Sequence, residues 1–167
     1  MTQSLDLFFL LPVFFAILVA LTGKKWSSTL LATMIGLLFL YPTAGVPFPP
    51  HITISLILNG FVFDLYLRQA KTSFYDLSRK HLIVASSLGN LAMAIGGLVV
   101  LEIFSPQSLS LTFLGKAPIG YLWAFALIGD TLVGAAGGFF GSIVVERVRG
   151  VQTRRALEAR ASLKVNA

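Results

Sequence analysis

Hydrophobic and polar residues follow one another in long blocks along this chain. Five apolar runs are separated by charged or proline-rich segments: residues 5–22, 27–41, 51–67, 82–104 and 121–149. A helix rises about 1.5 Å per residue and the hydrocarbon core of a bilayer is about 30 Å thick, so runs of this length predict membrane-crossing helices. The pattern predicts an all-α protein, a polytopic transmembrane helical bundle with about five spans.

The composition supports a membrane protein. Of the 167 residues, 56% are hydrophobic and only 12% are charged, a balance that a water-soluble domain of this size could not expose without aggregating. The chain has no cysteine, which excludes disulfides, thiolate catalysis and zinc–thiolate sites.

The charged residues predict an orientation. If the five runs cross the membrane in turn, every Lys and Arg except Lys116 falls on one side. Positive residues gather on the cytoplasmic side of membrane proteins. The amino terminus is therefore expected outside the cell membrane, with a transmembrane domain over residues 1–149 and a basic cytoplasmic tail over 150–167. The net charge of +6 then indicates contact with anionic lipids of the inner face rather than with nucleic acid.

Three polar residues lie deep inside the predicted spans. Asn59, Asn90 and Asp130 are expected about 12 to 18 Å below the outer edge, counting about 1.5 Å per residue. A carboxylate at this depth is costly, which makes it a candidate functional group. Two interpretations stay open: the three side chains bind a small polar ligand, or they join the helices by hydrogen bonds. Asp64 has a simpler interpretation, an ion pair with Arg68 one turn later.

Aromatic residues gather near the predicted outer face, with His51 among them. An aromatic cup with a few polar groups is typical of a small-molecule site, although interfacial aromatic belts have the same composition. His51, Tyr121 and Trp123 are the candidate outer wall. The other members are Tyr41, Phe48, Phe104, Phe113, Glu102 and Lys116.

Small residues recur at a spacing of four in two runs. Ala16 and Ala20 form one such pair, while Gly134, Gly138 and Gly141 belong to two overlapping repeats after Asp130. Faces of this kind let another helix approach closely. They are candidate docking surfaces for a partner, or packing surfaces within the chain.

No catalytic motif is present in the sequence. It has no histidine pair at helical spacing, no G-x-S-x-G elbow and no phosphate-binding glycine loop before a lysine. We expect neither an enzyme, a cofactor nor a metal site. His51 has no partner at ligand spacing and is interpreted as an interfacial residue.

Three segments together resemble the substrate-binding S components of energy-coupling factor vitamin transporters. These are Ala16-x-x-x-Ala20, the proline-rich segment leading into Leu58-Asn59-Gly60-Phe-Val-Phe-Asp64, and the glycine-rich run that ends in Glu146-Arg147. The resemblance implies a subunit that binds a solute and docks on membrane and ATPase partners through Ala16 and Ala20. It also implies six spans, with the additional one sought between residues 105 and 118.

The leading hypothesis is a membrane-embedded subunit that captures a small vitamin-like or nitrogen-containing solute at the outer face, for uptake with an ATP-driven partner. Asp130, Asn59 and Asn90 would contact the solute. The alternative is a non-catalytic structural subunit of a larger membrane complex. A third possibility is a proton-coupled carrier that uses Asp130 alone.

Overall fold

The computed structural model describes residues 2–40, 49–70, 77–104, 106 and 119–165. Over these residues the secondary structure is helical, which confirms the all-α prediction. The helices are α1 (Thr2–Thr22), α2 (Ser27–Leu38), α3 (Pro49–Gln69), α4 (Arg79–Phe104) and α6 (Ile119–Val165). The connection between residues 105 and 118, where a sixth span was sought, lies outside the described residues except for Pro106.

Within the described parts of the chain, three helices are long and apolar enough to cross a membrane: Pro50–Gln69, Arg79–Phe104 and Trp123–Gly150. Two shorter apolar helices accompany them, Phe8–Thr22 and Ser27–Leu38. The 12 residues of α2 give it a length of about 18 Å at 1.5 Å per residue, well short of a full bilayer core. The last helix does not end at Gly150, where the tail was expected to begin, but continues to Val165.

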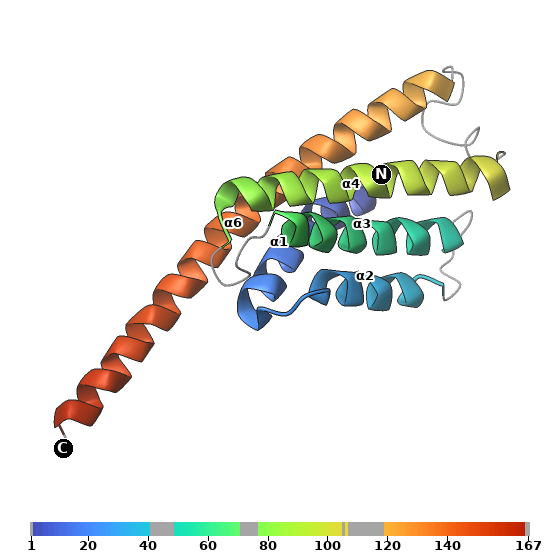
Figure 1. Ribbon diagram of the computed structural model, residues 1–167. Helices are drawn as coiled ribbons and strands as arrows, with labels where there is room; N and C mark the ends of the chain where they lie inside the picture. The colour runs from blue at the N-terminus through green and yellow to red at the C-terminus, as the bar shows by residue number, and fades with distance from the viewer. Residues whose placement is uncertain (1, 41–48, 71–76, 105, 107–118, 166–167) are drawn as a thin grey trace.

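The helices pack in a fixed order. Antiparallel α3 and α4 lie side by side, α2 covers the outer flank of α3, and α6 crosses α4 obliquely (Figure 1). The first helix, α1, lies against α6 and also touches α2 and α4. The first half of α6 diverges from α4 on one side of this crossing, and the last part of α6 extends away from the bundle on the other (Figure 1).

The glycines of α6 fix where it crosses its neighbours. A Cβ added at Gly138 would lie 2.7 Å from the carbonyl oxygen of Leu82 on α4, and one at Gly137 would lie 2.6 Å from that of Phe9 on α1. Real side chains do not tolerate such distances, so only glycine permits both contacts. The two overlapping repeats thus have different neighbours: Gly134 and Gly138 face α4, whereas Gly137 and Gly141 face α1.

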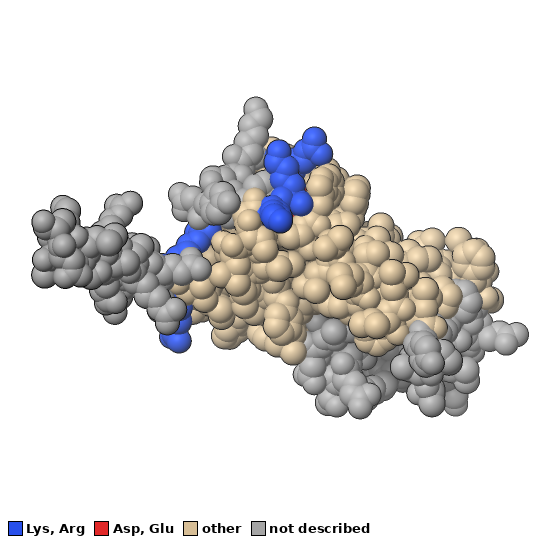
Figure 2. Space-filling model, turned by 90° about the horizontal axis from the view of Figure 1, so that it is seen from below, with Lys and Arg blue, Asp and Glu red and all other residues tan. Residues whose placement is uncertain are grey.

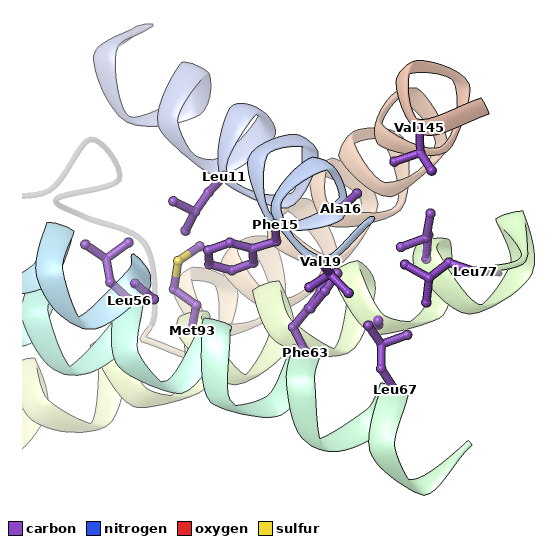
Figure 3. Close-up of a cluster of buried hydrophobic side chains, with 13 residues drawn as sticks. Leu11, Phe15, Ala16, Val19, Leu56, Phe63, Leu67, Leu77, Met93 and Val145 are labelled. Atoms are coloured by element: carbon purple, nitrogen blue, oxygen red, sulfur yellow. The ribbon is translucent and has the colours of Figure 1, made fainter. Parts of the chain in front are cut away.

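The apolar core lies where α1 crosses the inner faces of the other helices (Figure 3). Phe15 of α1 and Phe63 of α3 are fully buried and meet edge to face, with ring centroids 5.4 Å apart. Val19, Leu67 and Val145 extend the cluster toward one end of the bundle, and Leu82 of α4 also belongs to it. Burial of large side chains from four helices at one point holds the crossing together.

Asp64 does not form the predicted ion pair with Arg68, and that prediction was wrong. Its Oδ2 accepts hydrogen bonds from the backbone N–H and the hydroxyl of Thr29, both at 2.8 Å. Thr29 is the third residue of α2, and the helix has no capping hydrogen bond from the side chain of Trp26, which precedes it. A carboxylate from α3 therefore caps α2, at the end of the helix dipole that favours an anion. Arg68 instead lies over the Trp26 ring, 5.8 Å from its centre.

Charged residues gather at one end of the bundle. The Arg79 guanidinium donates to both carboxylate oxygens of Glu146, at 3.1 and 3.0 Å, and Tyr66 is hydrogen-bonded to His81 at 3.2 Å. The first pair joins the start of α4 to the later part of α6, and the second joins the start of α4 to the end of α3. In Figure 2 the visible Lys and Arg side chains lie toward that end, and the rest of the described surface in that view shows no acidic side chain.

Candidate functional site: a cavity beside Asp130

A cavity of about 170 Å³ lies at the end of the bundle opposite the charged end. It is bordered by the start of α3, the last turns of α4, the first third of α6 and one residue of α1. Its lining residues are Phe8, His51, Ile52, Ser55, Leu56, Met93, Ala94, Gly97, Leu98, Leu101, Ala126 and Asp130. The walls are mostly apolar, and His51, Ser55 and Asp130 bring polar groups to them.

The divergence of α6 from α4 leaves the space for this cavity. At Gly134 the two backbones are in contact, since an added Cβ would lie 2.6 Å from the Ser86 carbonyl oxygen. Before this contact α6 diverges from α4 (Figure 1). The cavity lies in the wedge between these two helices, since residues of both line it.

Asp130 stands one turn before Gly134, where the wedge begins. Among the described residues no hydrogen bond or ion pair reaches its carboxylate, although it is only partly exposed. Ser55 is engaged locally, because its hydroxyl donates to the His51 carbonyl oxygen at 2.6 Å. A carboxylate that faces a cavity without a protein partner can accept hydrogen bonds from a ligand or compensate a positive charge on it.

Asn59 and Asn90 do not line the cavity, but they meet each other beside it. The Asn59 Nδ2 donates to the Asn90 Oδ1 at 3.0 Å, and the Asn90 Nδ2 donates to the Phe8 carbonyl oxygen at 3.1 Å. Both side chains are fully buried. This chain of bonds ties α3, α4 and α1 together. Met93 connects it with the cavity, because its sulfur lies 3.4 Å from the Asn59 Nδ2 and its side chain forms part of the cavity wall.

The other candidates occupy different positions. Tyr121 is exposed and Trp123 is half-buried, and neither lines the cavity. Phe104 and Glu102 are exposed on the last turn of α4. Four members of the expected aromatic cup lie outside the described residues: Tyr41, Phe48, Phe113 and Lys116.

Ser55 is a lining residue that the sequence interpretation missed. It lies four residues after His51 and four before Asn59. This spacing places all three on one face of a helix, a signal that was available in the sequence. The apolar lining residues carried no comparable signal, since aliphatic side chains occur on every face of these helices.

The candidate docking residues are used within this chain. Ala16 is fully buried, and a Cβ added at Gly141 would lie 2.9 Å from the Cβ of Ala16. Gly134 and Gly138 lie against α4, and Ala20 packs against the core cluster. In this structure these small residues bring α1, α4 and α6 together.

No group of three or more His, Asp or Glu side chains that could hold a metal occurs among the described residues. Comparisons with protein-family models, with curated proteins and with solved structures find no match to this chain.

Proposed function

We propose that this protein is a membrane-embedded binding subunit that captures a small, positively charged, nitrogen-containing solute in the cavity beside Asp130. The observation that carries the proposal is a carboxylate that has no bonding partner among the described residues and lies in the wall of an otherwise largely apolar cavity, at one end of a helical membrane bundle. Ionisable groups inside membrane spans are costly and are retained mainly where they act.

The size and lining of the cavity indicate the class of solute. A cavity of about 150 Å³ holds one benzene ring, so about 170 Å³ suits a single ring or a short branched chain. Met93, Leu98 and Leu101 provide apolar walls, and Asp130 provides one negative charge at the narrow end. An amine with a compact apolar body satisfies both features: the ammonium group pairs with the carboxylate and the body fills the wedge.

The charged end of the bundle supports the orientation of the site. Positive residues favour the cytoplasmic side, and the cavity lies at the opposite end, so we propose that it opens to the outer face. The sequence carries no nucleotide-binding motif. The chain therefore cannot use ATP for uptake by itself, and we propose that it delivers its solute to an ATP-driven partner complex.

Binding to purified protein in detergent tests the proposal. A panel of small amines, each with a neutral alcohol or amide analogue of the same shape, is screened by thermal shift and by isothermal titration calorimetry. We expect at least one amine to bind at least ten times more tightly than its neutral analogue. Asp130→Asn should abolish this difference, because it removes the charge and changes the shape little.

Glu102→Gln is the matched control, since it makes the same chemical change on an exposed carboxylate outside the cavity. It should leave amine binding unchanged. The proposal fails if no amine binds the wild-type protein, or if Asp130→Asn and Glu102→Gln have the same effect.

One observation favours a structural subunit as the second candidate. The first part of α6 has an apolar face whose side chains are each more than 60% exposed: Tyr121, Phe125, Ile128 and Leu132. Another membrane subunit could pack there. Native mass spectrometry of gently extracted protein separates the two functions: a bound small molecule favours the binding subunit, and a stable complex with larger subunits and no small molecule favours the structural one.

A further inference from the structure

The outer flank of α2 carries two apolar grooves with a common border. One groove, of about 410 Å³, runs between α2 and α3, and the other, of about 450 Å³, runs between α2 and the end of α1. Trp26, Leu30 and Met34 line both. These residues are spaced by four and form one ridge along α2, so the two grooves lie on either side of that ridge.

Positive charge is concentrated at one end of this ridge. Lys24 and Lys25 are exposed and line the groove on the α1 side, and Arg68 lies over the ring of Trp26. Trp26 itself is held firmly: its backbone is left-handed, at φ 67°, and its ring stacks on Phe61 with centroids 5.6 Å apart. The positive charges and the firmly held Trp26 therefore lie together at the same end of the ridge.

The rest of the ridge offers an occupant almost no polar contact. The hydroxyl of Thr33 donates to the Thr29 carbonyl oxygen, and that of Thr29 donates to Asp64, both at 2.8 Å. Leu30 and Met34 are at least 60% exposed. Close helix–helix packing in membranes uses small residues, and the small residues of α2 face inward, with Ala32 and Gly36 buried. The ridge suits flexible chains better than a second helix.

We propose that this flank of α2 is a binding site for one anionic diacyl phospholipid. The phosphate pairs with Lys24 and Lys25, and the two acyl chains lie in the two grooves on either side of the Trp26–Leu30–Met34 ridge. Charge at one end and paired apolar grooves along the remainder match the two parts of such a lipid. The site is separate from the cavity beside Asp130, and its occupancy does not depend on the proposed solute.

Fluorescence quenching of Trp26 tests this proposal. The protein has two tryptophans, so Trp123→Phe leaves Trp26 as the reporter. This variant is reconstituted in phosphatidylcholine vesicles that contain increasing fractions of phosphatidylglycerol with brominated acyl chains, and in parallel with brominated phosphatidylcholine. We expect brominated phosphatidylglycerol to quench Trp26 at a mole fraction at least five times lower. The companion variant Trp26→Phe, which reports from Trp123, should show no such preference.

Charge variants in the Trp123→Phe background show whether the lysines create the preference. Each lysine near a membrane surface changes anionic-lipid binding about five-fold, so Lys24→Gln with Lys25→Gln should abolish the preference. Lys80→Gln with Arg147→Gln removes the same charge from other exposed positions at this end and should change it less than two-fold.

Three outcomes would overturn the proposal. Equal quenching by the two brominated lipids would show ordinary annular lipid. Equal loss in both charge variants would show a general surface charge effect. No quenching by either lipid would show that a protein, either a second copy or another subunit, covers the ridge.

Discussion

Two helix-borne carboxylates of this bundle occupy opposite surroundings. Asp64 is 2% exposed and accepts two hydrogen bonds from Thr29, so it serves as part of the α2–α3 contact. Asp130 borders a cavity, and no described residue bonds to it. The comparison shows that depth in a membrane span does not by itself mark a functional acid. Whether donors of the protein already bond to the carboxylate is the more informative property. In Asp64 they bond to Oδ2, while Oδ1 is buried without a hydrogen-bond partner among the described residues.

Helix packing explains the difference. Gly60 lets α2 approach α3 so closely that an added Cβ would lie 2.6 Å from the Ser28 carbonyl oxygen. That approach brings the start of α2 within reach of Asp64. Before Asp130, α6 diverges from α4 (Figure 1), and the cavity lies between the two helices. We call these the packed region and the cavity region.

The largest expected effect concerns the packed region. Asp64→Ala removes the acceptor for the Thr29 N–H and hydroxyl and leaves both donors without their partner. Loss of a cap and of bonds to a charged group should lower the free energy of unfolding by about 3 kcal/mol. Reversible unfolding in mixed micelles of detergent and sodium dodecyl sulfate measures it.

The control for Asp64→Ala is Glu146→Ala, which removes the exposed ion pair with Arg79. Both partners are roughly half exposed, and such pairs contribute about 0.2 to 1 kcal/mol. A loss of less than 1 kcal/mol for Asp64→Ala would mean that water or another group replaces the carboxylate. Asp64 and Asp130 would then differ less than their contacts indicate.

The next effect compares a packed and an open position of α6 through one kind of substitution. Gly138→Ala places a methyl group 2.7 Å from the Leu82 carbonyl oxygen and should lower the free energy of unfolding by about 2 kcal/mol. Gly129→Ala meets nothing within 4 Å and should be neutral or stabilising by up to about 1 kcal/mol, because alanine favours helix. Equal effects of the two would show that the crossing of α6 and α4 does not depend on the close contact at Gly138.

Much of the fold could be predicted from the sequence because it depends on the pattern of apolar residues. The five apolar runs correspond to the five described helices, and the double glycine repeat of α6 does bring neighbouring backbones into contact. The end of α6 could not be predicted in this way. A polar, helix-forming sequence after Gly150 is compatible both with a separate tail and with the continuous helix that the structure contains.

The candidate site was harder to predict because it depends on how the helices turn toward each other. The sequence placed Asn59, Asn90 and Asp130 at similar depths, but depth does not determine the direction of a side chain. In the structure the two asparagines bond to each other, whereas Asp130 lies in the wall of the cavity. The spacing of four residues predicts an ion pair between Asp64 and Arg68. In the structure Asp64 bonds instead to Thr29, which is 35 residues away in the sequence.

The smallest expected loss of stability belongs to the residue that we propose to be most important for binding. Asp130→Asn breaks no hydrogen bond to a described residue, and it replaces a charged group, which is costly within an apolar helix, by a neutral one of similar shape. The free energy of unfolding of the variant should therefore be equal to or higher than that of the wild type, measured in the same micelles as Asp64→Ala. A loss comparable to that of Asp64→Ala would show that Asp130 is a structural group as well, and the contrast between the two regions would then fail. Unchanged or raised stability together with lost amine binding would separate the two acids by role, since one substitution would impair folding alone and the other recognition alone.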